Sequence, residues 1–276
     1  MREIVVISGK GGTGKTTVCA AFAHLAENAV ICDLDVDVPD LHIVLDPRVE
    51  REEVFISGHT AEIVQDLCVQ CGRCADLCRF GAVRNEDGRF VIDPLDCEGC
   101  GVCRALCPAR AIDFPERRCG LWRISETRFG PFVHAQLEPG QENSGRLVSL
   151  LKQQARELAA AQGRELILCD GSPGVGCPVI SSLAGASLAV AVVINKADLN
   201  PAEAEAIRRF AVEQGHSLAG EIPFDPQATR AMIRRQALTE EDTPLAAVLA
   251  SIWKRVRALA DAMPVRRENL NPVHRG

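Results

Sequence analysis

Residues 9–16 read Gly9-Lys10-Gly11-Gly12-Thr13-Gly14-Lys15-Thr16 and fit the pattern G-x-x-x-x-G-K-[ST]. The apolar run 4–7 predicts a strand before them, and residues 15–27 predict a helix after them. In that setting the glycines let backbone N–H groups turn toward phosphate oxygens, and the helix N-terminus adds positive potential. We therefore predict a phosphate-binding loop, with Lys15 at the β- and γ-phosphates and the Thr16 hydroxyl on Mg²⁺. The residues predicted to bind the nucleotide here are Gly9, Lys10, Gly11, Gly12, Thr13, Gly14, Lys15, Thr16 and Thr17.

The same glycines admit a second interpretation. Gly9, Gly11 and Gly14 fit the dinucleotide fingerprint G-x-G-x-x-G, and Asp33 lies about where the ribose-binding acid of that motif would be. A glycine turn with a purely structural role is a further alternative. We favour the phosphate loop, because the dinucleotide fingerprint leaves Lys15-Thr16 and the downstream Asp170 unexplained.

Outside residues 60–115 the chain alternates apolar runs with helical patterns. The further predicted strands are 30–34, 165–170, 188–195 and 217–222. The further predicted helices are 144–161 and 200–215, one that starts at 225–226, and 243–262. Continuous apolar strands between helices indicate a mostly parallel sheet with helices on both faces, so the predicted fold class is α/β of the P-loop NTPase type.

Lys10 is a second lysine within the loop. The form K-G-G-x-G-K-T resembles the deviant phosphate loop of the group that includes MinD, Mrp, ArsA and the nitrogenase iron protein. In that group the lysine at this place reaches across a dimer to the nucleotide of the partner. The resemblance implies an ATP-dependent homodimer in which Lys10 and Lys15 are catalytic; the alternative is that Lys10 is a solvated loop lysine.

Acidic residues follow two of the predicted strands. Carboxylates at the carboxyl end of a strand beside a phosphate loop are placed to hold Mg²⁺ or to position water. Asp33 and Asp35 resemble the switch I segment of the group, which implies support near Mg²⁺ for Asp33 and a water-positioning, catalytic role for Asp35. Asp170 ends the strand 165–170 and resembles the Mg²⁺-binding acid, while Gly174 resembles the glycine that moves with the γ-phosphate.

The segment Asn195-Lys196-Ala197-Asp198 follows the next strand at the base-reading position. An N-K-x-D motif selects guanine in GTPases, because its aspartate accepts from the N1 and N2 hydrogens of the base. The lysine-rich phosphate loop instead favours ATP. We predict ATP, with Asn195 and Asp198 as base-binding candidates and a GTP-selective protein as the alternative.

The chain has thirteen cysteines, and eight of them form the repeated pattern C-x-x-C-x-x-C-x-x-x-C. Doubled, this pattern resembles the bacterial ferredoxin with two [4Fe–4S] clusters, over about fifty residues. In that family the fourth cysteine of each run crosses to the other cluster. The resemblance implies one cluster on Cys68, Cys71, Cys74 and Cys107, and a second on Cys97, Cys100, Cys103 and Cys78. Structural zinc is the alternative, but the triple spacing fits it poorly.

Five cysteines lie outside this pattern. Cys19, Cys32 and Cys169 fall in predicted helix or strand contexts and are interpreted as small apolar fillers. Cys119 and Cys177 lie in less regular contexts and are weaker candidates for a redox or metal role.

Composition excludes several classes of protein. The formal net charge is −6 and the pI about 5.6, which argues against nucleic-acid binding. No apolar run approaches a membrane span, and the first residues form a strand rather than a signal peptide, so we expect a cytoplasmic protein. The amphipathic helix 243–262 resembles the membrane-binding helix of MinD, but packing on the sheet is the favoured interpretation.

Taken together, the motifs resemble MinD-superfamily ATPases with an inserted ferredoxin domain. The predicted division is a P-loop ATPase domain in two parts, 1–58 and 116–264, an inserted ferredoxin-like domain at 59–115, and a mobile tail at 265–276. From 187 to 198 one strand runs directly into N-K-A-D, so a βα unit of roughly 30 residues is absent relative to the family. Residues 127–134 and 142–145 also resemble family segments, and His134 is interpreted as structural.

The resemblance implies a nucleotide-gated iron–sulfur protein. ATP binding would close the homodimer, hydrolysis would reopen it, and the output would be electron transfer or cluster delivery to an acceptor protein that the sequence does not name. One alternative is a MinD-like positioning or scaffold protein whose clusters sense redox state. Another is a nucleotide-binding module that does not turn over, because the sheet is shortened.

Overall fold

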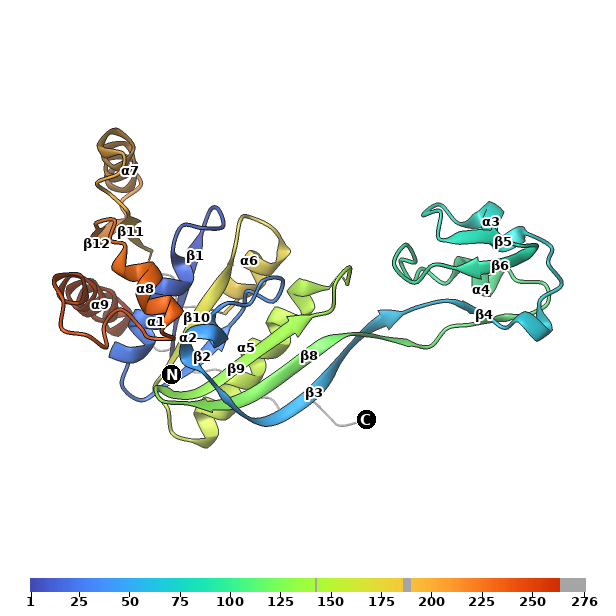
Figure 1. Cartoon of the computed structure of the whole chain (residues 1–276), viewed down its shortest axis with the longest axis horizontal. Helices are drawn as coiled ribbons and strands as arrows, with labels where there is room; N and C mark the ends of the chain where they lie inside the picture. The colour runs from blue at the N-terminus through green and yellow to red at the C-terminus, as the bar shows by residue number, and fades with distance from the viewer. Residues whose placement is uncertain (142, 186–189, 264–276) are drawn as a thin grey trace. The chain divides into compact units, whose positions relative to one another are not determined.

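The computed structural model describes residues 1–141, 143–185 and 190–263, which fold into two compact units (Figure 1). The nucleotide unit comprises Met1–Glu52, Trp122–Gln136 and the described residues from Ser144 on. The cysteine unit comprises Glu53–Leu121 and the described part of 137–143. The predicted tail 265–276, the start of the predicted strand 188–195 and residue 142 of the segment 142–145 lie outside the described residues.

A six-stranded sheet forms the centre of the nucleotide unit. Its strand order is β1 (Arg2–Ser8), β10 (Leu166–Pro173), β2 (Ala29–Asp33), β9 (Gly130–Leu137), β8 (Glu116–Thr127) and β3 (Arg48–His59). The first four are parallel neighbours, and β2 is buried along its whole length, as continuous apolar strands in a covered sheet require. The register aligns Val6, Asp170 and Asp33, so the two acids lie side by side on neighbouring strands, with Asp33 at the end of β2 and Asp170 within β10.

Helices pack on this sheet. Three of them lie where the sequence predicted a helix, namely α1 (Lys15–Leu25), α5 (Ser144–Ala161) and α9 (Pro244–Ala262), whereas α6 (Cys177–Leu183) was not predicted. Phe22 of α1 and Trp253 of α9 meet with ring centroids 5.1 Å apart, and both belong to the main core. Burial of Leu249, Ile252 and Trp253 confirms that α9 packs on the protein. In the described part of the chain, no helix is long and apolar enough to cross a membrane.

The remaining strands of this unit, β11 (Ala191–Asn195) and β12 (Ser217–Ile222), form a separate parallel pair. Between them lies α7 (Pro201–Glu213), which starts as predicted: Asn200 accepts from Glu203 N, and Pro201 follows. After β12 comes α8 (Gln227–Ile233). Among the described residues, β1 bonds to β10 alone, and no strand lies between α6 and β11.

The cysteine unit is built from short elements. Strands β4 (Glu62–Ile63) and β7 (Ile112–Asp113) pair, as do β5 (Val83–Glu86) and β6 (Arg89–Ile92). The helical turns are η1 (Gln65–Leu67), α3 (Arg73–Leu77) and α4 (Val102–Ala105). Strands β3 and β8 run into this unit from the nucleotide unit, so its boundary at Glu53 falls inside β3.

The sequence analysis missed the strands β3, β8 and β9 and the short helices α2 (Leu41–Leu45) and α6. Strand β3 alternates too little to be recognised, because nearly all of its side chains are exposed and many are charged. Helix α2 has only five residues, fewer than a helical pattern needs to be detected.

Candidate functional site

A cavity of about 550 Å³ opens at the carboxyl ends of the parallel strands. The predicted loop from Lys10 to Thr17 forms one side of it, and Asp35 lies on another. The loop has the backbone that its glycines predicted, since Gly12 and Gly14 take φ angles of +76° and +89° that other residues rarely adopt. A cavity of this size is sufficient for a nucleotide.

Lys15 is surrounded by carboxylates at the base of this cavity. Its Nζ donates to Asp170 Oδ1 at 2.7 Å and lies 3.3 Å from Asp35 Oδ2. Burial lowers the pKa of Lys15, but the attraction of Asp170, Asp35 and Asp33 more than offsets this, so the pKa is raised. The structure therefore brings three predicted site residues together around one cation.

Two carboxylate oxygens beside Lys15 are buried and have no partner among the described residues. They are Oδ2 of Asp33 and Oδ2 of Asp170. Burial raises the pKa of both acids, most strongly for Asp33, whose pKa is raised further by Asp170. Asp170 also accepts from the Thr16 hydroxyl. Buried carboxylate and hydroxyl oxygens are the ligands of a hard cation, so this donor set fits Mg²⁺.

Two further predicted site residues, Lys10 and Gly174, do not take part in the cluster around Lys15. Lys10 is exposed at the mouth of the cavity, and its side chain makes no ion pair with any described residue. Gly174 does not line the cavity; its N–H donates to Ser8 O at 2.9 Å, and its φ is +92°. Gly174 therefore ties the end of β10 to the start of the phosphate loop.

The predicted base-reading residues separate in the structure. Asn195 lines the cavity and donates from Nδ2 to Thr13 O at 2.7 Å, which joins β11 to the phosphate loop. Asp198 does not line the cavity, and its Oδ1 accepts from the N–H of Phe224 at 2.6 Å. The carboxylate of Asp198 thus holds the loop after β12 instead of facing the cavity.

Sequence reasoning missed much of the opposite side of the cavity. Phe224 and Asp225 lie there with apolar side chains from α8, α9 and the segment between them, namely Ala228, Met232, Leu238, Leu245 and Leu249. The one available signal was the turn Asp225-Pro226 after a strand, at the end of the sheet where ligands bind.

The eight patterned cysteines gather into two sets of four. Cys68, Cys71, Cys74 and Cys107 line one cavity of the cysteine unit. Cys78, Cys97, Cys100 and Cys103 line a second cavity. The fourth cysteine of each run therefore lies with the first three of the other run. This exchange is the arrangement of two-cluster ferredoxins.

Each of the two cysteine sets has a glycine with positive φ that lies close to a phenylalanine ring. Gly72 and Gly101 have positive φ, and an added Cβ would lie 3.2 Å from the Phe90 ring and 3.5 Å from the Phe114 ring. Ala111 N donates to Cys107 Sγ at 3.3 Å. In the described residues no three His, Cys, Asp or Glu side chains converge as for a single metal ion. Thiols spread around an apolar cavity fit a cubane cluster, in which each thiolate binds a different iron.

The other cysteines divide by burial. Cys19, Cys32 and Cys169 are fully buried in the nucleotide unit, which confirms them as apolar fillers. Cys119 is also buried, where its thiol donates to Ser57 O, whereas Cys177 is exposed at the start of α6.

Comparison with known proteins gives a family match over most of the chain. Residues 4–238 match the CobQ/CobB/MinD/ParA nucleotide binding domain. An uncharacterized protein of Methanocaldococcus jannaschii is 37% identical over 195 residues, which are 69% of this chain and 67% of that protein. A ferredoxin-like protein in the nif region of Rhizobium leguminosarum bv. trifolii is 40% identical over 53 residues, or 17% of this chain and 83% of that protein. Among solved structures, the cell division ATPase MinD of Pyrococcus furiosus covers 94% of this chain and 99% of its own, with 14% identity and a TM-score of 0.48.

Proposed function

The chain belongs to the CobQ/CobB/MinD/ParA family of nucleotide-binding domains, and from this premise we propose that it couples ATP to iron–sulfur chemistry. The observation that carries the proposal is that one chain holds both a phosphate loop facing buried acids and two sets of four thiols around separate cavities. Similarity to a ferredoxin-like protein supports iron–sulfur clusters. The finer proposal is two [4Fe–4S] clusters, one in each cavity.

ATP is favoured over GTP by the position of Asp198. Guanine selection by N-K-x-D needs a free carboxylate at the base, but Asp198 accepts the Phe224 N–H. The far side of the cavity is lined mainly by apolar side chains, which can pack against the face of a purine base. Such contacts do not distinguish guanine from adenine. Asp198→Asn should therefore leave the preference for ATP over GTP unchanged. The measurement is the displacement of a bound fluorescent ADP by ATP and by GTP.

Hydrolysis would start from a rearrangement of Lys15. Phosphate oxygens compete with Asp170 and Asp35 for its ammonium, and Thr16, Asp33 and Asp170 are the residues that would hold Mg²⁺. When bound, that ion neutralises charge on the phosphates. Asp35, released from Lys15, would then position the attacking water. Lys10 would act on the nucleotide of a second copy, which makes a homodimer the proposed active form.

The proposed output is electron transfer to an acceptor protein, with cluster delivery as the alternative. Sets of four thiols that each surround their own cavity favour tightly held clusters, whereas delivery needs a labile one. We place the protein in the reducing cytoplasm, where exposed thiols such as Cys71 and Cys100 stay reduced.

The test is single-turnover hydrolysis by anaerobically purified protein, comparing ATP with GTP at oxidised and reduced clusters. Hydrolysis of ATP at a rate that depends on cluster state supports the coupling. Equal rates in both states would contradict it, and no hydrolysis with both clusters intact would leave a nucleotide-binding module.

A further inference from the structure

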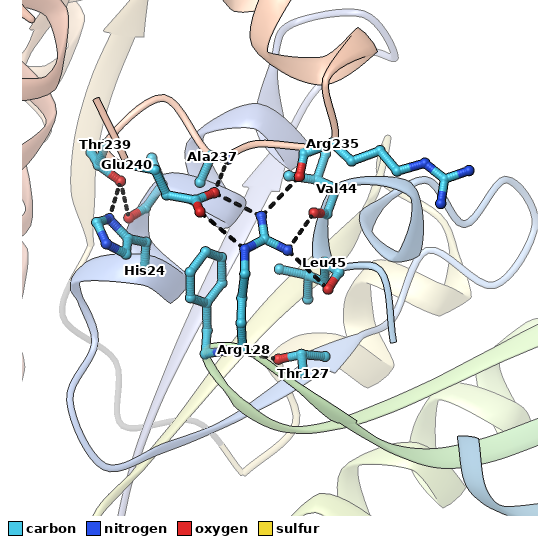
Figure 2. Close-up of polar contacts among 11 residues, drawn as sticks. His24, Val44, Leu45, Thr127, Arg128, Arg235, Ala237, Thr239 and Glu240 are labelled. Carbon is cyan, nitrogen blue, oxygen red and sulfur yellow. Dashed lines mark hydrogen bonds and ion pairs between the residues drawn. The ribbon is translucent and has the colours of Figure 1, made fainter. Parts of the chain in front are cut away.

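The turn between β8 and β9 carries an arginine whose guanidinium makes five polar contacts (Figure 2). Arg128 Nη1 donates to the carbonyls of Val44 and Leu45, at 3.0 and 3.1 Å. Its Nη2 donates to Arg235 O at 2.9 Å and to Glu240 Oε1 at 2.7 Å, and its Nε to Glu240 Oε2 at 3.0 Å. The planar fork of arginine is thus used in full, which a lysine could not reproduce.

The partners of Arg128 do not line the nucleotide cavity themselves but come from two segments that each contain residues lining it. Val44 and Leu45 end α2, which begins directly after the cavity-lining Asp40, a few residues past Asp35. Glu240 follows the cavity-lining Leu238 in the segment between α8 and α9. One guanidinium therefore joins the segment that follows the predicted water-positioning acid to the segment that contributes Leu238 to the cavity.

The turn holds Arg128 in one orientation. Thr127 Oγ1 donates to Gly130 O at 2.7 Å and accepts from Phe129 N at 3.2 Å. The Phe129 ring lies under the guanidinium, 4.4 Å from Cζ to the ring centroid. Gly130 has a φ of +120°, and an added Cβ would lie 3.2 Å from Ala29 O. This accounts for the segment 127–130, whose chemistry the sequence did not explain.

Chain connectivity links this contact to the cysteine unit. Only Asp46 and Pro47 separate α2 from β3, and β8 ends at the turn that carries Arg128. Strands β3 and β8 both run from the nucleotide unit into the cysteine unit. A shift of α2 is therefore passed to the start of one strand by covalent connection and to the end of the other through Arg128.

We propose that Arg128 is a positioning residue that couples the nucleotide-dependent position of α2 to strand β8. This inference rests on the proposed nucleotide-dependent function. ATP would draw Asp35 away from Lys15, α2 would follow Asp35, and Arg128 would carry the shift into the end of β8. Without Arg128, nucleotide would still bind at the phosphate loop and α2 would remain covalently joined to β3, but β8 would no longer respond.

The first test is hydrogen–deuterium exchange of the full chain with and without Mg-ADP. In wild type we expect slower exchange in residues 9–18. We also expect exchange in residues 116–127, which form β8, to slow by at least about fivefold. Arg128→Gln should keep the first effect and lose the second, and Arg128→Lys should retain only part of it. Arg234→Gln is the matched control, since it removes an exposed ion pair to Glu241 in the same segment and should behave as wild type.

The second test measures the affinity for Mg-ADP with clusters oxidised and reduced. Coupling is reciprocal, so cluster oxidation state should change the affinity for Mg-ADP in wild type. The ratio of the affinities at oxidised and reduced clusters should therefore differ from one in wild type and approach one in Arg128→Gln. Retained protection of 116–127 in Arg128→Gln, or no nucleotide effect on 116–127 in wild type, would overturn the inference. A wild-type ratio of one together with the expected exchange pattern would instead refute the coupled function and leave the role of Arg128 standing. Should Arg128→Gln fail to fold, Glu240→Gln weakens the same contact and serves in its place.

Discussion

Lys15 is the residue on which the nucleotide-free site depends most. It lies 2.7 Å from Asp170 and is almost fully buried, so it balances acids that would otherwise be buried without a countercharge. Removing one partner of such a group leaves an uncompensated charge in a region of low dielectric. The same lysine is thus expected to stabilise the empty protein and to bind phosphate in the loaded one.

Lys15→Gln should lower the free energy of unfolding of the nucleotide-free protein by about 3 kcal/mol, because Asp170 loses its ion pair. It should also abolish nucleotide binding. The double variant Lys15→Gln with Asp170→Asn should recover most of the stability in urea denaturation, but no nucleotide binding. A double variant as unstable as Lys15→Gln alone would contradict this balance of charges.

His134 gives the protein a specific sensitivity to acid. Burial, followed by the nearby Arg123 and His42, lowers the pKa of His134 to about 3. The unfolded chain binds this proton near pH 6.5, so the stabilisation is complete above that pH and is lost as pH falls toward 3. Lowering the pH from about 7 to about 5 should remove about 2 kcal/mol of stability through this group alone.

The measurement is urea unfolding at both pH values. His134→Gln should lose this part of the pH dependence, whatever its absolute stability. Ser125→Ala removes the 2.9 Å hydrogen bond to His134 Nε2 but keeps the buried imidazole, so it should retain the dependence. An unchanged slope in His134→Gln would show that other groups cause the acid sensitivity.

At the scale of elements, the sequence predicted strands where it has continuous apolar runs, and helices where an apolar helical pattern follows a clear N-cap. Helix α5 and strand β12 have the predicted bounds, and α7 starts at the predicted Asn200-Pro201. Strand β3 was not predicted, because a long strand with mostly exposed, charged side chains lacks the two-residue alternation of a half-buried strand. Strand β8 was not predicted either; its buried residues do not alternate regularly along the strand.

The candidate site shows the same division. The phosphate loop and the two cysteine runs are contiguous motifs, so they can be recognised from their local residue spacing. The exchange of the fourth cysteines between the runs followed only from the resemblance to two-cluster ferredoxins. The apolar side of the nucleotide cavity is different, because Phe224, Met232 and Leu245 come from three separate segments. Ordinary apolar residues carry no motif, and only tertiary packing brings them to one cavity.

Strand β11 is expected to support nucleotide binding through one side chain. Asn195→Ala removes the 2.7 Å bond to Thr13 O, worth about 1 kcal/mol, so affinity for a fluorescent ADP should fall about fivefold. Asn200→Ala is the matched control. It removes the N-cap of α7 and should cost about 1 kcal/mol of stability without changing the affinity. Equal affinities for wild type and Asn195→Ala would show that β11 does not position the loop.

At the scale of the whole molecule, the exchange of the fourth cysteines makes a prediction that simple spacing does not. Cys107→Ser should destroy the cluster that we propose on Cys68, Cys71, Cys74 and Cys107, although Cys107 lies in the other run. Iron should fall from about eight to about four atoms per chain, with the spectrum of the other cluster retained.

Iron analysis and electron paramagnetic resonance of the reduced protein provide the measurement. Cys119→Ser is the matched control in the same unit, because Cys119 is buried, bonds to Ser57 O and lines neither cavity. Loss of the cluster on Cys97, Cys100 and Cys103 in Cys107→Ser would reverse the ligand assignment.

The position of β1 has a practical consequence for anyone who purifies this protein. Among the described residues β1 bonds to β10 alone, so it is an edge strand of the sheet. Its charges do not shield that edge, since Arg2 pairs with Asp261 and Glu3 with Lys152, and Ile7 is 44% exposed. Such an edge strand can pair with an extended peptide of another chain, including another β1. We expect turbidity on concentration while the fold is still intact, so shelf life will depend on dilution more than on temperature.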